Sequence, residues 1–282
     1  MNHQYDVGIV GGGLGGLCAS ILLAKAGHSV VLFEKNFYPF NKVCGEYISK
    51  ESEPFLRSIG VPLDDWNLPQ ISNFGLTHHL GKRIDVKLPL GGIGVSRYFL
   101  DDKLADIALA NGVVLLQGTE VLDITFSEKT ENFNVLIKDG DFTFRTVLGA
   151  FGKRSKLDKK LKRPFVNQKK DAKNNFVGVK YHVESPIEDN KIELHLFEEG
   201  YAGISRVEGG KSCFCYLTTA NLLQKSGGSI AEMEAKYLQK NPYLKEHFDT
   251  FSKINQEPVT ISQIEFGPKE QVNNHVLLLG DA

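Results

Sequence analysis

Apolar and polar positions at the start of this chain predict a strand, a helix and a second strand. The apolar run Val7 to Val10 predicts a buried strand, and Leu14 to Ala26 has the spacing of an apolar helix that Gly27 ends. Ser29 to Phe33 predicts the next strand, and the following segment, Lys35 to Glu46, is irregular and rich in aromatic residues. This βαβ order is typical of α/β proteins.

Short strand patterns dominate the rest of the chain. Helices are predicted at Glu51 to Ser58, Phe99 to Ala110 and Ile230 to Lys240. Strands are predicted at 74–80, 83–88 and 113–117, in a three-stranded meander over 121–148, and at 176–183, 192–197, 202–207, 213–218, 259–265 and 276–279. Lys153 to Lys173 holds ten Lys or Arg and two Asp, which predicts a charged connector between two units.

This order predicts an α/β chain with α+β insertions. The βαβ unit is interrupted by β-rich segments and resumes with the last apolar strand, which leads into Gly280-Asp281-Ala282. A domain that bound only a nicotinamide nucleotide would continue with regular strand and helix alternation. The sequence therefore predicts a Rossmann-like domain combined with a β-rich one.

Composition excludes several classes of function. The chain has 282 residues and a formal charge of −1, which gives no case for nucleic acid or an anionic membrane surface. No apolar run reaches the roughly 18 residues of a spanning helix, and no signal peptide follows Met1, so we expect a cytoplasmic protein without an integral membrane segment. Cys18, Cys44, Cys213 and Cys215 lack the spacing of a zinc site, and no metal site is predicted.

A glycine motif supplies the first candidate chemistry. Gly11, Gly13 and Gly16 form G-x-G-x-x-G between the first strand and the first helix. These glycines permit a tight turn, close approach of a pyrophosphate and close packing of helix on strand, while the helix N-terminus favours the phosphate charge. Glu34 ends the second strand about 20 residues on, where a carboxylate accepts hydrogen bonds from ribose hydroxyls. A dinucleotide with a free ribose diol is predicted.

These and other motifs resemble the flavoprotein superfamily of geranylgeranyl reductases, aromatic hydroxylases such as para-hydroxybenzoate hydroxylase, and flavin halogenases. The further motifs are Arg97 with Asp101 and Leu104, Gly149 to Ser155, and Gly280-Asp281-Ala282. Lys42-Val43-Cys44-Gly45-Glu46 resembles the K-x-C-G-E segment of the geranylgeranyl-reductase-like branch. The resemblance covers essentially the whole chain and implies FAD as the cofactor. It also implies an FAD-binding domain of residues 1–72, 98–175 and 266–282, with 73–97 and 176–265 forming the substrate domain.

The resemblance implies roles for individual residues. Arg97 would meet the FAD phosphates or ribityl chain, and the Val121 backbone would pair with the adenine edge. Asp281 would bind the ribityl hydroxyls, with Gly280 letting the chain pass close to the cofactor. The remaining residues of the implied cofactor site are Leu14, Lys35, Cys44, Gly45 and Gly152.

The implied catalytic residues are Cys44 and Glu46, because the K-x-C-G-E loop of the reductase-like branch lies beside the flavin. A thiol or carboxylate there would deliver the proton that completes hydride addition to a double bond. The alternative is that Cys44 packs and Glu46 pairs with Lys42. Tyr201, Phe214 and Tyr216 are candidate walls of the substrate pocket.

Two departures from the superfamily pattern bear on function. An Asp-Gly pair followed by Arg usually contacts NAD(P)H, but Phe151, Gly152 and Asp158 stand at those positions. The electron donor is therefore either NAD(P)H bound elsewhere or a redox protein. The superfamily also continues beyond Gly-Asp-Ala, so the sequence is a fragment, or a partner supplies the rest, or FAD is bound poorly.

The sequence leaves three functions open. The first is an FAD-dependent reductase of an unsaturated apolar or lipid-like small molecule. The second is a flavin monooxygenase acting on an aromatic or polyketide-like compound, which oxygen consumption would distinguish. The third is a truncated nucleotide-binding chain without turnover, which would stay colourless when FAD is added.

Overall fold

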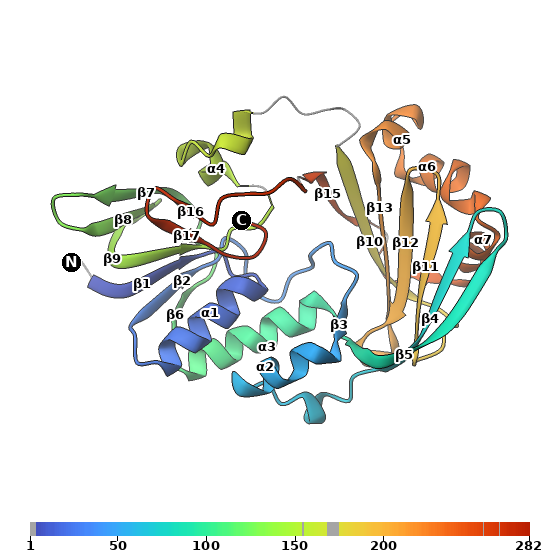
Figure 1. Ribbon diagram of the computed structural model, residues 1–282, viewed down its shortest axis with the longest axis horizontal. Coiled ribbons are helices and arrows are strands. Elements are labelled where there is room, and N and C mark those ends of the chain that lie inside the picture. Colours follow the sequence, from blue (N-terminus) through green and yellow to red (C-terminus); the bar gives the residue numbers. More distant parts are fainter. Residues whose placement is uncertain (1–3, 154, 168–174, 256, 265) are drawn as a thin grey trace.

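Two β-sheets lie side by side in the computed structural model (Figure 1), which describes residues 4–153, 155–167, 175–255, 257–264 and 266–282. The first sheet has the order β16-β17-β9-β1-β2-β6, and β7 and β8 extend it from β9. Its strands are β1 (Gln4–Val10), β2 (Val30–Phe33), β6 (Val114–Leu116), β7 (Val121–Ser127), β8 (Asn132–Ile137), β9 (Gly140–Gly149), β16 (Val272–Asn273) and β17 (Val276–Leu278). The β1-β2, β1-β9, β2-β6 and β9-β17 pairs are parallel.

Both faces of the first sheet are covered. Helices α1 (Leu14–Lys25), α2 (Glu53–Ser58) and α3 (Arg97–Ala110) contribute to a core on one face, with side chains of β1 and β2. The β7-β8-β9 meander encloses a second core on the other face, around Phe33 and Phe144. All four residues of β2 are buried, as expected for a strand with protein on both faces.

The second sheet has the order β14-β10-β13-β12-β11-β4-β5-β3, and β15 pairs with β10. Its strands are β3 (Tyr47–Ser49), β4 (Gln70–His78), β5 (Arg83–Gly94), β10 (Phe176–Glu184), β11 (Lys191–Phe197), β12 (Gly200–Arg206), β13 (Ser212–Thr219), β14 (Ser252–Lys253) and β15 (Val259–Ile264). Strands from the first third of the chain therefore join strands from its second half in one sheet. The predicted fold class, a Rossmann-like domain with a β-rich one, is confirmed.

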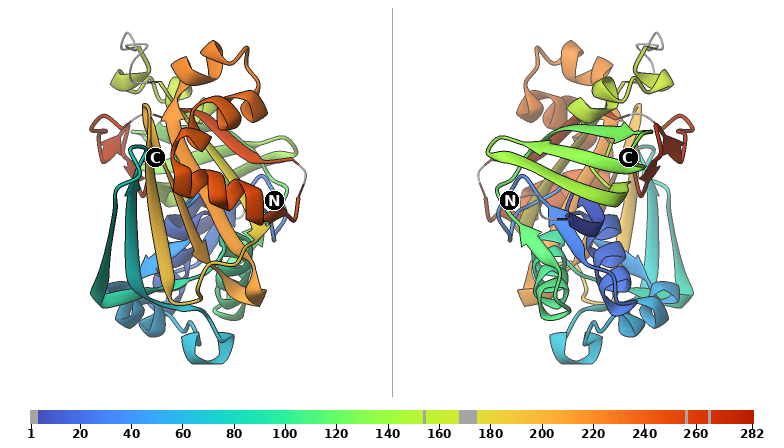
Figure 2. Two further views of the ribbon diagram at one scale, coloured as in Figure 1. Left: turned by 90° about the vertical axis from the view of Figure 1, so that its right-hand side faces the viewer. Right: turned by 90° about the vertical axis from the view of Figure 1, so that its left-hand side faces the viewer.

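Helices cover only one face of the second sheet. Helices α5 (Ala220–Lys225), α6 (Ile230–Lys236) and α7 (Pro242–Thr250) lie on the side away from the first sheet (Figures 1 and 2). They pack on Phe214 and Tyr216 of β13. The opposite face, called here the inner face, is turned toward the first sheet.

The structure differs from the sequence prediction at several elements. Helices α5 and α7 were not predicted from the sequence. Strand β5 continues past Pro89 because a register shift against β4 accommodates the proline. The charged connector contains the short helix α4 (Lys156–Lys160), but Arg154 and 168–174 lie outside the described residues, as does Glu265. The domain boundaries remain a prediction, and β4 already begins at Gln70.

Candidate functional site

The glycine loop has the close contacts that its sequence predicts. A Cβ on Gly16 would lie 2.0 Å from the Gly11 carbonyl oxygen, and one on Gly11, whose φ is +109°, would lie 2.3 Å from the Ala150 oxygen. Gly11 and Gly16 thus allow α1 to pack against β1 and β9. A Cβ on Gly13 would meet nothing closer than 3.8 Å, an ordinary van der Waals distance, so the space beside the backbone before Leu14 admits a further atom.

Two cations face this space. Arg97 Nη2 and Lys42 Nζ each lie 3.8 Å from the position of a Gly13 Cβ. Both are held by Asp101, which is fully buried: Arg97 donates two hydrogen bonds of 2.8 Å, and Lys42 donates one of 2.9 Å. Positive charge beside the N-terminus of α1 fits a pyrophosphate.

Glu34 lies at the end of β2, beside the same loop. One of its oxygens accepts from the Gly12 N–H at 2.9 Å, and the other accepts from the backbone and side chain of Asn36. A carboxylate has further lone pairs, so Glu34 keeps acceptor capacity for a ribose. The Thr119 N–H donates to the Glu34 carbonyl, which places the segment before Val121 against this end of β2.

The other predicted cofactor residues occupy separate positions. Val121 begins β7 and pairs with Ile137, while Lys35 is exposed. Gly280 lies against α1, since its nitrogen is 3.8 Å from the position of a Gly15 Cβ. Asp281 is exposed, and its carboxylate lies 3.8 Å from Lys153 Nζ, next to Gly152. The structure thus brings the first and last parts of the sequence together beside the glycine loop.

The K-x-C-G-E loop is fastened to the inner face of the second sheet. The Glu46 carboxylate forms an ion pair with Lys180 Nζ and lies 2.7 Å from His182 Nε2, both on β10. Lys180 also donates to the Lys42 carbonyl at 3.2 Å, and the Cys213 thiol donates to the Cys44 carbonyl at 3.3 Å. We call Glu46, Lys180 and His182 the Glu46 clamp, because it joins the loop to the sheet.

The clamp fixes the charge on Glu46. Although burial alone raises the pKa of this carboxyl, the His182 and Lys180 hydrogen bonds and charges hold it below its usual range. Glu46 is therefore ionised and serves as an anchor, which does not favour it as a proton donor. Its φ of +56° is rare for a residue with a side chain and is held by the clamp and by the Arg97 N–H, which donates to its carboxylate at 2.8 Å.

Thiols also line this contact. Cys213 and Cys215 alternate along β13 and face the loop, not the helices. Burial raises the pKa of the Cys215 thiol to about 12 and raises that of Cys213 as well, so both stay neutral. Cys44 is half-buried, and its sulfur accepts from the Glu46 N–H at 3.5 Å.

The rest of the inner face is apolar. Directly opposed residues in adjacent strands share a face. Two rows therefore extend from the Glu46 clamp across the sheet: Lys180, Cys215, Gly203, Leu194, Leu76, Ile84, and His182, Cys213, Ser205, Ile192, Phe74, Val86. Tyr201 and Leu196 lie on the same face, beyond Gly203 and Leu194. Of these, Ile84, Val86, Leu196 and Tyr201 are between 37% and 61% exposed.

Of the three candidate wall aromatics, only Tyr201 faces the first sheet. Phe214 and Tyr216 are on the opposite face, buried under α5 to α7, and the Tyr216 hydroxyl donates to Glu234 at 2.8 Å. Expecting them to line a pocket was wrong, because alternate residues of β13 point to opposite faces.

Sequence analysis missed the residues that anchor the loop. Lys180 and His182 were visible as polar residues two apart in an otherwise apolar strand, next to Gly178. Asp158, at the position where the superfamily carries the NAD(P)H-binding arginine, caps α4 and pairs with the fully buried Arg163 at 2.8 Å. Asp158 thus has a structural role in α4 and with Arg163.

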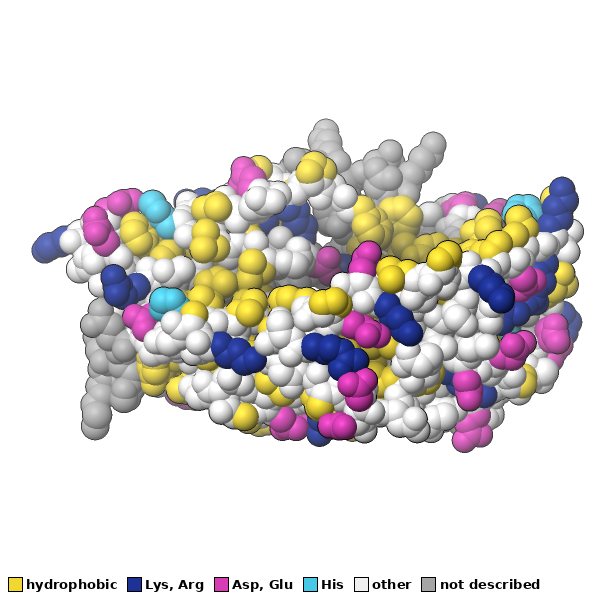
Figure 3. Space-filling model, turned by 60° about the horizontal axis from the view of Figure 1, so that its bottom comes forward, with side chains coloured by type: hydrophobic (Ala, Val, Ile, Leu, Met, Phe, Trp, Pro, Cys, Tyr) yellow, Lys and Arg dark blue, Asp and Glu magenta, His cyan; other side chains and the backbone are white. Residues whose placement is uncertain are grey.

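On the face in Figure 3, basic and acidic side chains of the described residues are intermingled, so no large single-sign field forms there. This agrees with the formal charge of −1. Among the described helices, none is both long and apolar enough to span a membrane.

A single protein-family model matches nearly the whole chain. Residues 4–282 match the model of the FAD binding domain family, and the chain belongs to that family. FAD as the cofactor is thereby confirmed, and so is the resemblance to flavoproteins drawn from the glycine loop. The space beside Gly13, faced by Lys42 and Arg97, fits the FAD pyrophosphate.

Individual proteins share 18–30% sequence identity with the chain. Menaquinone reductase of Mycolicibacterium smegmatis is 30% identical over 171 residues, which cover 58% of this chain and 41% of that protein. A flavoprotein/dehydrogenase from Cytophaga hutchinsonii shares the fold at a TM-score of 0.82 and 19% identity, over 99% of this chain and 71% of that one. A geranylgeranyl bacteriochlorophyll reductase-like protein from Thermoplasma acidophilum has a TM-score of 0.78 and 18% identity, over 100% and 72%.

Proposed function

We propose that the chain is the FAD-binding part of an oxidoreductase that reduces an unsaturated, apolar, lipid-like small molecule. The apolar inner face carries this proposal. Ile84, Val86 and Leu196 are exposed on the same sheet face to which the K-x-C-G-E loop is fastened. Apolar surface next to a cofactor site favours an apolar ligand. The partial similarity to a menaquinone reductase supports the same substrate class.

The chain's own residues would bind and orient the cofactor. Lys42 and Arg97 would hold the phosphates, with Asp101 keeping both cations in place. Glu34 would accept from the ribose hydroxyls. Bound FAD, once reduced, supplies the hydride for the substrate double bond.

The single proton that completes the hydride addition would come from the Cys44 thiol. Cys44 precedes the anchored Glu46 on the same loop, so the Glu46 clamp determines where this thiol lies. Glu46 itself is ionised and would act as a positioning residue. The inner face would cover the reacting atoms and exclude water from them.

Anaerobic reoxidation tests this function. The FAD-loaded protein is reduced with dithionite, and flavin absorbance is followed after a short-chain menaquinol, a polyunsaturated isoprenoid or an aromatic acid is added. We expect the apolar substrates to reoxidise the flavin and the aromatic acid to leave it reduced. Cys44→Ser should slow the reaction at least tenfold, while Cys18→Ser, a matched change in α1, should not.

Three other results would favour a different function for the chain. In a parallel aerobic assay, oxygen consumption that depends on the aromatic acid would indicate monooxygenation. A protein that binds FAD but is reoxidised by none of the three substrates would refute reduction of this class. A protein that stays colourless with FAD would support a non-catalytic chain.

A further inference from the structure

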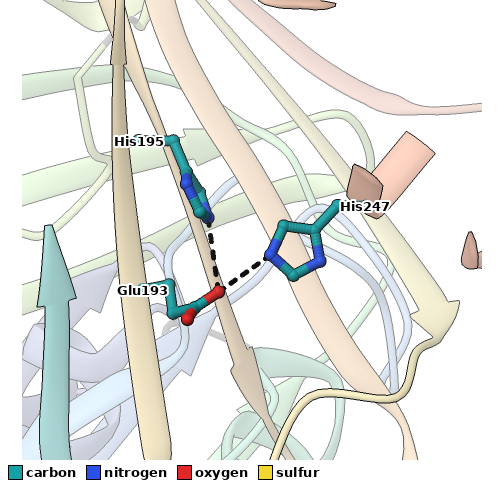
Figure 4. A group of neighbouring side chains, drawn as sticks. All are labelled: Glu193, His195 and His247. Carbon is teal, nitrogen blue, oxygen red and sulfur yellow. Dashed lines mark hydrogen bonds and ion pairs between the residues drawn. The ribbon is translucent and has the colours of Figure 1, made fainter. Parts of the chain in front are cut away.

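A separate group of potential metal ligands lies on the face of the second sheet opposite to the K-x-C-G-E loop (Figure 4). Glu193 and His195 are two residues apart on β11 and point to the same side, and His247 approaches them from α7. Their ligand atoms all lie within 4.8 Å of one another. Glu193 Oε2 is 2.8 Å from His247 Nε2 and 3.7 Å from His195 Nε2.

One of these ligand atoms makes no hydrogen bond within the part of the chain that the structure describes. His195 is fully buried, and its Nε2 forms no hydrogen bond with any described residue. Its Nδ1 lies 2.8 Å from Thr77 Oγ1, which also accepts from Asn241 Nδ2 at 2.9 Å. In the tautomer in which Nδ1–H donates to Thr77, Nε2 offers a lone pair toward Glu193.

Two cations orient the Glu193 carboxylate through the oxygen that does not face the histidines. Its Oε1 accepts from Arg83 at 2.7 Å and from Lys191 at 3.2 Å, which leaves Oε2 directed at the histidines. Asp85 pairs with both cations, at 2.7 Å to Arg83 and 3.1 Å to Lys191. The charges of Asp85 and Glu193 thus equal those of Arg83 and Lys191. The surroundings of the site therefore carry no net positive charge that would repel a divalent ion.

A hydrogen bond alone does not explain this arrangement. If the His247 Nε2–H donates to Glu193, those two residues are satisfied, but the buried His195 Nε2 is left without a partner. A metal ion would use all three atoms at once. Two imidazole nitrogens and one carboxylate oxygen form a donor set that zinc binds, with water in the fourth position.

We propose that Glu193, His195 and His247 bind one zinc ion that joins α7 to β11. The sequence predicted no metal site, because the third ligand lies 54 residues from the first. The site is on the helix-covered face of the second sheet, away from Cys44 and Glu46. The zinc ion would therefore stabilise the packing of α7 on the sheet.

Metal titration of the untagged, FAD-loaded protein tests this site. After chelator treatment, Zn²⁺ is titrated in competition with a chromophoric chelator, and Co²⁺ is added separately to record its ligand-field bands beyond the flavin absorption. We expect one equivalent of Zn²⁺ to bind with a Kd of about 1 μM or lower and Co²⁺ to give tetrahedral-type bands.

Variants on two elements locate the ligands. His247→Ala on α7 and Glu193→Gln on β11 should each raise the Kd at least tenfold, while His28→Ala, an exposed histidine elsewhere, should leave it unchanged. Zinc should also raise the Tm of the wild-type protein and not that of His247→Ala. Unaltered FAD absorbance and circular dichroism would show that each variant is folded.

Two results would overturn the proposal. One is the absence of saturable zinc binding to the wild-type protein, and the other is unchanged binding in both His247→Ala and Glu193→Gln. Since the two variants alter different elements, a folding defect in one leaves the other as a test.

Discussion

Gly13→Ala should separate cofactor binding from folding. A Cβ at this position has its nearest neighbours, Arg97 Nη2 and Lys42 Nζ, at 3.8 Å, and the backbone angles of φ −83° and ψ −175° suit alanine. Gly13 is the N-cap of α1, where glycine is preferred over alanine. We therefore expect the apoprotein to lose only about 1 kcal/mol of unfolding free energy.

The same methyl group would occupy the space in front of the two cations. A phosphate kept away from the backbone there loses a charge-assisted hydrogen bond, which is worth about 1.5–3 kcal/mol. This corresponds to a rise of the FAD Kd by about 10- to 150-fold. Gly16→Ala is the contrasting variant, because its Cβ would lie 2.0 Å from the Gly11 oxygen and must distort the loop.

Two measurements on the same samples distinguish these effects. FAD titration of the apoprotein, followed by flavin fluorescence, gives the Kd, and urea unfolding followed by circular dichroism gives the stability. An unchanged Kd in Gly13→Ala would refute the assignment of the pyrophosphate site. A loss of several kcal/mol in the Gly13→Ala apoprotein would refute the argument that a methyl group fits beside this backbone.

Three further predictions concern the residues around the loop. Glu46→Gln should lower the free energy of unfolding, measured with urea, by about 3–5 kcal/mol, because Lys180 keeps a buried charge without its partner. A loss below about 1 kcal/mol would contradict the role given to the Glu46 clamp. Because its folded pKa is lowered, Glu46 should contribute its full stability above an ordinary pKa near 4.5 and lose it as the pH falls below that value. Acid unfolding monitored by circular dichroism should show this loss in the wild-type protein and not in Glu46→Gln. Arg97→Lys keeps the charge but loses the planar fork on Asp101, so FAD titration should show a Kd about tenfold higher, and an unchanged Kd would show that charge alone suffices.

Local sequence patterns predicted the strands and helices that surround the glycine loop. The glycine loop, the all-buried β2 and Glu34 at its end follow from neighbouring residues, because a βαβ unit is formed by segments adjacent in the sequence. The helical spacing of Phe99 to Ala110 was likewise a local signal, although α3 begins two residues earlier, at Arg97.

Long-range register could not be predicted in the same way. Glu46 and His182 are 136 residues apart, and their contact depends on how β10 pairs within a sheet that also includes β3 and β5. Helix α7 had a readable start, Asn241 before Pro242, with the Asn241 side chain accepting from Tyr243 and Leu244. The apolar residues of such a short helix are too few to distinguish it from a loop without its partner sheet.

Gly280 resting against the start of α1 has a consequence for biosynthesis. A ribosome releases the glycine loop early, yet β17, which pairs with β9 and leads to Gly280, is translated only after the entire second sheet. Until then the end of β9 at Leu148 and Gly149 has no strand beside it on the side opposite β1 and is exposed to solvent or to chaperones. Loading of the vitamin-derived chromophore is therefore expected only after the entire second sheet has been synthesised.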